Sequence, residues 1–505
     1  MEKVQAAMAT TTESLDRLIG PLGTMKMFIG GEWVDSLEGA QDDVTTPRDG
    51  SVVGHVPRGE RADAQRAVAA ANRAEQVLRE LTVFERSKLC LRIADVIDAR
   101  TDHLARVISL DQGKPYHSEG RWEAGAFSHF FRQAAEDIVR LNGESIPSSD
   151  RNKRVITFHR PRGTYAVVTP WNFPYNIPSE YISAALACGN PVVWVPAPST
   201  SACAVAYAEC LAEADLPPGA FNLVTGAGPV VGDEIVASAG TRGVAFTGSP
   251  QTGETIAQRA AGKPLLLELG GNGPVIVLDD ADLDAAVQGI VFSAFFNAGQ
   301  ACSATERVLV HRSIHDELAE RLVAAAAEVR LGDPFDPDTT MGPLNNEQVA
   351  AKMDAHIEDA ESRGATVLAG GGRADGMLGD LYYRPTVLSK VSSAMRVNRE
   401  ESFGPIIPLV AFDDAAEAIE LANDNELGLV SSIYTKSLRR AFFFGENVQT
   451  GIVNINETPD YWESHIPYGG ASGKRSGIGR LGGANTLREM SEVRSMIIDL
   501  GSETD

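Results

Sequence analysis

The order of apolar and polar positions divides the chain into a helical part followed by an alternating part. Apolar residues recur at spacings of three and four through 62–110 and again through 120–143, which predicts helices. One of these helices should end at Gly113, with Pro115 just beyond it. From about 160, short apolar stretches such as "GTYAVVTP" and "NPVVWVPAP" alternate with helical segments. Continuous apolar strands separated by helices indicate a parallel sheet covered on both faces.

A second α/β region begins at "PVIVLDD" and continues through strands such as "RVLVH" and "PIIPLVAF". It also contains an Ala-rich helix, expected from 314 to 330. We therefore predict an α/β protein with one sheet domain made of 26–144 and 163–271 and a second made of 272–480.

Two segments fit neither domain. Residues 145–162 alternate like a polar β ribbon, and 492–501 read as a terminal strand. An isolated ribbon is only marginally stable, and an exposed strand edge invites pairing with another chain. We predict that 145–162 and 481–505 form a small β oligomerisation element of a homodimer or homotetramer. Residues 1–25 are expected to be a loose N-terminal extension.

Composition and charge narrow the class of protein. A chain of 505 residues exceeds what one core normally serves, so about two or three domains are expected. The formal charge of -23 argues against nucleic acid or an anionic membrane as a partner. No apolar stretch reaches the roughly 18 residues that span a bilayer. The five cysteines form no CxxC pair, which argues against a metal site and predicts a reducing, cytoplasmic compartment.

Two strand-to-helix turns are candidate phosphate-binding loops. "VTGAGPVVGDEI" has glycines spaced GxGxxxG, but the acidic residue expected about twenty positions later is Phe246, so an ordinary turn stays open. "FTGSPQTG" places Gly248 and Ser249 where a helix N-terminus presents N–H groups to a pyrophosphate. Ser249 could equally be a helix N-cap. Two such loops in one sheet favour a nucleotide.

"FFNAGQACSATERV" sets Cys302 among small residues directly after an apolar segment. A lone cysteine there is usually an inert buried thiol, unless a base and an oxyanion donor accompany it. Glu268 in "LLLELGGNG" is the candidate base, because burial would raise its pKa into a useful range. The alternative is a strand-end glutamate that points to solvent or binds the backbone of the following Gly-Gly. Asn172 in "VVTPWNFPYN" is the candidate donor, unless it only caps its own turn.

These residues lie in six motifs that follow one another along nearly the whole chain: "TPWNFP" (169–174), "FTGS" (246–249), "LELGG" (267–271), "GQAC" (299–302), "ESFGP" (401–405) and "PYGGASGKRSGIGR" (467–480). In these motifs and their order the chain resembles the NAD(P)-dependent aldehyde dehydrogenase superfamily. The resemblance implies a Rossmann-like cofactor domain, a second α/β catalytic domain and a β oligomerisation element.

The resemblance also implies the chemistry. The Cys302 thiolate attacks an aldehyde, and the Asn172 amide and the Cys302 N–H hold the oxyanion. Hydride passes to the nicotinamide, and water activated by Glu268 hydrolyses the resulting thioester to the acid. Glu401 is expected at the nicotinamide ribose, Phe403 on its ring, Gly228 and Pro229 at the adenine, and Gly253 with Gly248 and Ser249 at the pyrophosphate. The remaining expected cofactor contacts are Thr169, Pro170, Trp171, Val195, Ala197, Pro198, Phe246, Leu269 and Gly270.

The chain departs from the family at the adenosine ribose. Family members usually place a lysine, and often a glutamate three residues later, where this chain has Val195 and Pro198. Loss of the acid removes a repulsion against a 2′-phosphate, while loss of the lysine removes an attraction. The two effects oppose each other. We expect NAD with a weaker ribose anchor, and NADP stays open.

The expected substrate-facing residues, again by resemblance, are Tyr175, Ile177, Ala301, Ser303, Trp462, His465 and Tyr468. Glu180 and Tyr181 follow the same turn as Tyr175. The aromatic residues predict an apolar or aromatic aldehyde, although Trp462 could instead be a packing residue or lie at a subunit contact. A protonated His465 would bind a carboxylate, phosphate or sulfonate, so a small anionic semialdehyde is the alternative. Two further alternatives are a cofactor-independent thiol esterase and a non-catalytic protein that keeps the fold.

Overall fold

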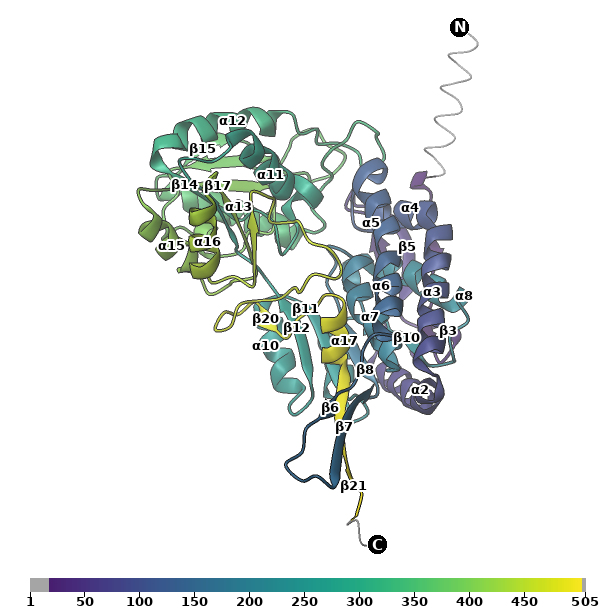
Figure 1. Ribbon diagram of the computed structural model, residues 1–505. Coiled ribbons are helices and arrows are strands. Elements are labelled where there is room, and N and C mark those ends of the chain that lie inside the picture. The colour runs from purple at the N-terminus through teal and green to yellow at the C-terminus, as the bar shows by residue number, and fades with distance from the viewer. Residues whose placement is uncertain (1–17, 502–505) are drawn as a thin grey trace, which may run out of the picture.

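The computed structural model describes residues 18–501, and its first sheet carries the predicted parallel strands (Figure 1). The sheet has eight strands in the order β20-β12-β11-β8-β9-β10-β2-β3, of which the central five are parallel. The order reverses between β11 and β8, a position where ligands commonly bind at the carboxyl ends of the strands. The strands are β2 (Met27–Ile29), β3 (Glu32–Val34), β8 (Tyr165–Val168), β9 (Val192–Val195), β10 (Phe221–Leu223), β11 (Gly243–Gly248), β12 (Leu265–Leu269) and β20 (Gly477–Ile478).

Helices cover both faces of this sheet, as the continuous apolar strands predicted. Along β9, Val193 and Val195 join one apolar cluster, while Val192 and Trp194 join another on the opposite face. Successive strand residues point to opposite faces, so this sheet is buried on both sides. The helices of this part are α2 (Arg61–Glu80), α3 (Val83–Ala99), α4 (Thr101–Asp111), α5 (Arg121–Ala126), α6 (Ser128–Ile138), α7 (Asn176–Cys188), α8 (Ser201–Glu213), α9 (Asp233–Ala237) and α10 (Pro250–Arg259).

The second sheet has seven strands in the order β15-β16-β17-β14-β13-β18-β19, with its own apolar core. Its strands are β13 (Pro274–Val277), β14 (Arg307–His311), β15 (Thr366–Ala369), β16 (Thr386–Ser389), β17 (Ile406–Phe412), β18 (Val430–Tyr434) and β19 (Ile452–Ile455). Its helices are α11 (Leu283–Phe295), α12 (His315–Ala327), α13 (Glu347–Ser362), α14 (Arg396–Arg399), α15 (Ala415–Asn423) and α16 (Leu438–Asn447).

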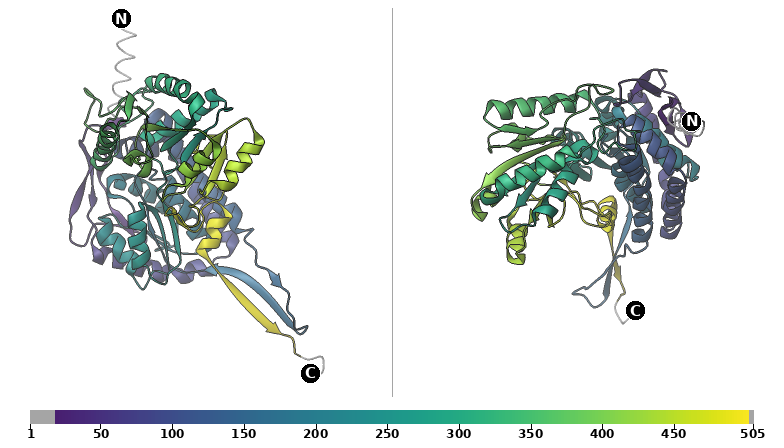
Figure 2. Two further views of the ribbon diagram at one scale, coloured as in Figure 1. Left: turned by 90° about the vertical axis from the view of Figure 1, so that its left-hand side faces the viewer. Right: turned by 90° about the horizontal axis from the view of Figure 1, so that it is seen from above.

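A three-stranded arm extends from the body of the molecule (Figures 1 and 2). It consists of β6 (Ser145–Ile146), β7 (Lys153–Pro161) and β21 (Ser491–Asp499), with β21 and β7 antiparallel along their full length. The predicted ribbon and the predicted terminal strand therefore pair with each other. Before the arm, β20 extends the first sheet and α17 (Ala484–Met490) packs on α7. A smaller sheet contains β1 (Gly23–Thr24), β5 (Val52–Pro57) and β4 (Gln41–Thr45).

Some predicted boundaries differ from the structure. The helix expected over 120–143 is split into α5 and α6, after a π-helical turn at Tyr116–Gly120. The Ala-rich helix ends at Ala327 rather than at 330, because the Arg330 backbone is bound by Thr340 and Met341. Within 18–501 there is no helix long and apolar enough to cross a membrane and no group of side chains suited to a metal ion. Most of the extension expected at 1–25 lies outside the described residues.

Candidate active site

The loop that presents Cys302 has an unusual backbone that is held from the first domain. After α11, Asn297 and Ala298 have φ values of 51° and 54°, and Gly299 has 72°. Non-glycine residues in the left-handed region persist only where their surroundings hold them there. Here the N–H of Asn297 donates to the buried carboxylate of Glu119 (3.0 Å), and its side-chain oxygen accepts from Gln112 (2.9 Å). The loop is therefore a positioned element.

Cys302 is the half-buried member of a set of otherwise buried cysteines. Its Sγ lies 3.4 Å from the hydroxyl of Tyr468. Burial raises the pKa of the Cys302 thiol well above its usual range, and the neighbouring Glu268 raises it further, whereas the Tyr468 hydrogen bond lowers it. Tyr468 is thus the side chain that favours the thiolate.

Glu268 lies near the end of β12 with 4% of its surface exposed. Its Oε1 has no hydrogen-bond partner among the described residues. Burial raises the pKa of Glu268 to about 8, because a low-dielectric site disfavours the charged form. The solvent-facing alternative for this residue is thereby excluded. A carboxyl group that titrates near neutral pH is suited to general-base work.

Asn172 is buried beside the same loop. Its side-chain Nδ2 donates to the backbone carbonyl of Gln300 (3.1 Å). Its backbone carbonyl accepts from the side-chain amide of Asn297 (2.9 Å). The second N–H of this amide and the backbone N–H of Cys302 have no hydrogen-bond partner in the described part of the chain. Asn172 and Cys302 line one cavity, so two donors are left free in its lining, as stabilisation of an oxyanion would require.

Two cavities meet at these residues. One has a volume of about 590 Å³ and the other about 760 Å³, and Cys302, Glu268 and Thr247 line both. A reactant in either cavity can therefore reach the same sulfur.

The smaller cavity lies at the carboxyl ends of β8, β11 and β12, as expected for a dinucleotide. Eight of the predicted cofactor residues line it: Pro170, Trp171, Gly248, Ser249, Leu269, Gly270, Glu401 and Phe403. Ser249 also caps α10 by accepting from Thr252 N–H (3.2 Å). Ser249 is therefore the N-cap of α10. The N-terminus of this helix faces the cavity.

Glu401 and Phe403 line this cavity and are held there by hydrogen bonds. Glu401 accepts from Gly271 N–H (2.8 Å), and burial raises its pKa to about 7. A Cβ at Gly270 would lie 2.7 Å from the Glu401 carboxylate and would clash with it, so this position favours glycine. Buried Glu306 accepts from the N–H groups of Ser402 and Phe403 (2.7 and 2.9 Å). These hydrogen bonds fix the loop that carries Glu401 and Phe403.

The other predicted cofactor residues do not line this cavity. Thr169, Val195, Phe246 and Gly253 are buried in the sheet or against it. Thr169, for example, accepts from the Trp194 indole N–H (2.9 Å). Ala197, Pro198, Gly228 and Pro229 are at least partly exposed, after β9 and β10 at the same edge of the sheet. Neither Val195 nor Pro198 has a side chain that can donate a hydrogen bond to a ribose.

The larger cavity receives five of the seven predicted substrate residues: Ile177, Ser303, Trp462, His465 and Tyr468. Tyr175 and Ala301 must be corrected, because both are buried and neither lines the cavity. Tyr175 stacks on Phe127 (5.0 Å between ring centroids) and donates to the Leu104 carbonyl (3.1 Å). It is a core residue at the start of α7.

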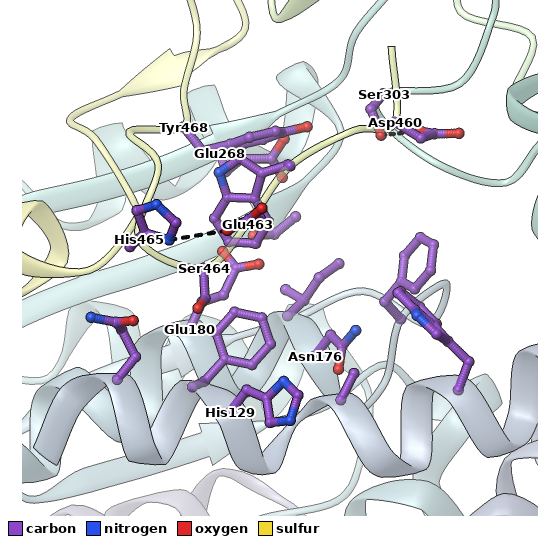
Figure 3. Close-up of a pocket in the computed structure, with 18 of the residues that line it drawn as sticks. His129, Asn176, Glu180, Glu268, Ser303, Asp460, Glu463, Ser464, His465 and Tyr468 are labelled. Atoms are coloured by element: carbon purple, nitrogen blue, oxygen red, sulfur yellow. Dashed lines mark hydrogen bonds and ion pairs between the residues drawn. The ribbon is translucent and has the colours of Figure 1, made fainter. Parts of the chain in front are cut away.

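The sequence did not indicate the opposite wall of the larger cavity. This wall comes from α5 and α6, and its lining residues include Trp122, His129, Phe130, Arg132, Gln133 and Glu136. In the smaller cavity, Asn346, Gln348 and Lys352 on or beside α13 were also missed. No local motif marks these residues, because they are ordinary amphipathic helix positions. Glu180 and Asp460 also line the larger cavity, with Asp460 bound to the Ser303 hydroxyl (Figure 3).

Comparison with known proteins agrees with this geometry. The model of the aldehyde dehydrogenase family matches residues 33–496. The NADP(+) succinate-semialdehyde dehydrogenase of Escherichia coli (strain K12) is 39% identical over 475 residues, 94% of this chain and 97% of that protein. The 3-sulfolactaldehyde dehydrogenase of Pseudomonas putida is 37% identical over 92% of this chain and 95% of that protein. The crystal structure of an NAD-dependent aldehyde dehydrogenase from Sinorhizobium meliloti has a TM-score of 0.93, at 35% identity, and covers 97% of each chain.

Proposed function

The chain belongs to the aldehyde dehydrogenase family, and we propose on that premise that Cys302, Glu268 and Asn172 carry out its NAD(P)-dependent oxidation of an aldehyde to a carboxylic acid. The observation that carries these roles is the junction of two cavities at Cys302 and Glu268. One cavity suits a dinucleotide and the other a small substrate. An inert thiol would need neither.

In the first step the Cys302 thiolate forms a C–S bond to the aldehyde carbon. The carbonyl oxygen becomes an oxyanion and accepts hydrogen bonds from the Asn172 amide and the Cys302 N–H. Tyr468 donates to the sulfur and stabilises the thiolate before attack. Bound NAD(P)+ would supply the acceptor for the hydride that leaves this carbon.

The second step hydrolyses the thioester that remains on Cys302. Glu268 takes a proton from water through its unpartnered Oε1, and the hydroxide attacks the acyl carbon. The C–S bond then breaks, and the products are the carboxylic acid and the Cys302 thiol. The buried position of Glu268 supports this role, since its raised pKa lets it hold and release a proton near neutral pH.

For the cofactor, Glu401 and Phe403 would hold the nicotinamide riboside, while Gly248 and Ser249 would face the pyrophosphate. The family uses NAD or NADP, and relatives of both kinds occur among similar proteins. We propose NAD for this chain, with a weak ribose anchor, because Val195 and Pro198 offer no hydrogen-bonding group. A large advantage of NADP in kcat/KM would contradict that preference.

For the substrate, the relatives favour a small anionic aldehyde over the apolar or aromatic aldehyde that the sequence first indicated. The Escherichia coli relative is named for succinate semialdehyde and the Pseudomonas putida relative for 3-sulfolactaldehyde. The first of these aldehydes carries a carboxylate and the second a sulfonate. In this chain the basic residues that line the cavity are His129, Arg132 and His465.

Aldehyde-dependent formation of NADH, followed by absorbance, tests the reaction. Wild-type protein should form NADH and acid in equal amounts, and Cys302→Ser should not turn over while still binding cofactor. Hydrolysis of activated esters at full rate without cofactor, together with no NADH from any aldehyde, would favour the thiol esterase. Oxidation retained in Cys302→Ser would remove the nucleophile from the proposal.

We also propose a homo-oligomer in the cytoplasm. The arm strand β21 exposes a row of apolar side chains, of which Ile497 is 68% exposed. Such a strand is unfavourable in water and suits pairing with another subunit. All five cysteines are free, which supports a reducing compartment.

A further inference from the structure

A pair of buried hydroxyl groups, those of Tyr181 and Thr247, lies next to the candidate base. The Tyr181 hydroxyl oxygen is 2.6 Å from Thr247 Oγ1, and either group can be the donor at this distance. The Tyr181 O–H can also donate to the backbone carbonyl of Phe246 (3.2 Å). Both side chains of the hydroxyl pair are buried, and Tyr181 is fully so.

The register of the sheet places Thr247 beside Glu268. Thr247 belongs to β11 and Glu268 to the neighbouring β12, and the two residues are partners in the parallel pairing of these strands. Side chains of one face recur at every second residue of a strand, so paired residues share a face. Both side chains accordingly line both cavities. Hydrogen bonding from the Thr247 hydroxyl lowers the pKa of Glu268, which burial raises.

Tyr181 reaches Thr247 from the helix α7. Successive helix residues point about 100° apart, so Glu180 lines the substrate cavity while Tyr181 contacts the end of β11. A buried hydroxyl group needs a hydrogen-bond partner, and a tyrosine has one proton to donate. Two acceptors compete for that proton, the Phe246 carbonyl and the Thr247 oxygen.

The choice of acceptor sets what the Thr247 hydroxyl does. When Tyr181 donates to Thr247, the Thr247 O–H is free to donate to the Glu268 carboxylate. When Tyr181 donates to the Phe246 carbonyl, Thr247 can donate to the Tyr181 oxygen and accept from a protonated Glu268. The two arrangements differ by rotation of hydroxyl groups, so the pair can follow the proton that the base gains and releases.

We propose that Tyr181 is a positioning residue for the base: it orients the Thr247 hydroxyl, which donates to the Glu268 carboxylate that activates water. The inference rests on the role proposed for Glu268 in thioester hydrolysis. A hydrogen bond to a charged acceptor is stronger than one to a neutral acceptor, so the hydroxyl pair favours the deprotonated base. It opposes burial, which favours the neutral acid.

Other titratable groups also face Glu268. Glu401 raises the pKa of Glu268, whereas hydrogen bonding to Cys302 lowers it. The full set of these groups, apart from Tyr181, is Cys302, Glu180, Glu401 and Tyr468. All of them stay in place when one hydroxyl of the pair is removed, so a change in the titration of Glu268 then reports on the pair.

Infrared difference spectroscopy of the full-length protein measures the pKa of Glu268 directly. The band of its protonated carboxyl group is identified by its loss in Glu268→Gln and is followed as pH is raised. Thr247→Val should move this titration upward by about one pH unit, because a hydrogen bond to a charged group is lost. Tyr181→Phe should give a smaller shift in the same direction. The double variant should titrate as Thr247→Val does, because Tyr181 acts through Thr247.

Two further variants separate orientation of the base from a general effect on packing. Thr247→Ser keeps the hydroxyl and should titrate like the wild type. Tyr207→Phe removes another buried hydroxyl, which accepts from Ser179 (3.1 Å), and should leave the titration of Glu268 unchanged. With succinate semialdehyde and NAD+, the pH at which kcat is half-maximal should move with the infrared band in each variant.

An unchanged titration in Thr247→Val would overturn the inference. So would shifts of Tyr181→Phe and Thr247→Val that add in the double variant, since Tyr181 would then act on Glu268 independently. The expected infrared shifts in a protein that forms no NADH from any aldehyde would instead overturn the proposed function, and the catalytic role of the hydroxyl pair with it.

Discussion

The hydroxyl of Tyr468 lies 3.4 Å from the Sγ of Cys302, although the two residues are separated by 166 positions in the chain. Tyr468 belongs to the segment that returns from the second sheet towards β20. Its O–H is the polar group that favours the thiolate in a site where burial favours the thiol. The C-terminal segment thus contributes to the reactivity of a cysteine in another part of the chain.

Tyr468→Phe should therefore raise the pKa of the Cys302 thiol. We expect alkylation of Cys302 by iodoacetamide to move to higher pH and kcat/KM to fall by about ten-fold, the scale of one hydrogen bond to a charged group. Tyr382→Phe is the matched control, because its buried hydroxyl has no partner among the described residues. An unchanged pH profile of alkylation would remove Tyr468 from the mechanism.

The raised pKa of Glu268 predicts how turnover depends on pH. A base acts when it is deprotonated, so a pKa of about 8 means that kcat rises as pH increases through about 8. In Glu268→Gln that rise should disappear, and steady-state turnover should fall by at least about a hundred-fold. Rapid mixing should still show a burst of NADH, because the thioester forms but is not hydrolysed. Normal steady-state turnover in this variant would assign the base to another group.

Asn172→Ala removes the proposed oxyanion donor. We expect kcat to fall by about a hundred-fold to a thousand-fold, the usual effect of losing one such donor. Alkylation of Cys302 should be nearly unchanged, because the donor acts on substrate oxygen rather than on sulfur. The melting temperature must be compared as well, since Asn172 also donates to the Gln300 carbonyl. Equal losses of alkylation and turnover would indicate a purely structural role.

A buried ion pair between Lys114 and Glu123 supports the turn that carries Asn172. Both side chains are fully buried, and Glu123 also accepts from the N–H groups of Tyr175 (3.0 Å) and Asn176 (3.2 Å). Lys114→Met leaves an uncompensated charge, so the free energy of unfolding in urea should fall by about 3–5 kcal/mol.

The Lys114 effect has a matched control and a rescue. Lys26→Met breaks an exposed pair with Asp35 and should cost about 1 kcal/mol or less. Adding Glu123→Gln to Lys114→Met should restore part of the loss, because the unpaired charge is removed. If Lys114→Met lowers the free energy of unfolding as little as Lys26→Met does, Glu123 does not need Lys114 to compensate its buried charge.

The exposed apolar side chains of the arm strand β21 predict that the protein forms an oligomer. Ile497→Glu places a charge on the exposed apolar strand and should shift sedimentation towards a smaller species than the wild type. Val77→Glu, an exposed apolar position on α2, is the control and should leave the assembly unchanged. A wild-type protein that sediments as a monomer would contradict the oligomer.

Local motifs were sufficient to predict much of this protein. Three features follow from short sequences whose spacing and chemistry are visible without coordinates. They are the parallel strands, the Glu401–Phe403 loop, and the placement of Cys302, Glu268 and Asn172 at one site. Apolar periodicity also predicted the two sheets, because burial on both faces leaves continuous apolar strands. The arm was predicted as two segments that fit neither core.

The substrate cavity depended on tertiary structure. Successive residues of a helix point about 100° apart, so Tyr175 enters the core while Asn176 and Glu180 face the cavity. Sequence alone determined which groups we propose to react, because a candidate nucleophile, base and amide donor lie in recognisable local motifs. Only the tertiary structure decided which charges surround the substrate, because that depends on how α6 and α7 rotate and pack against the C-terminal loop.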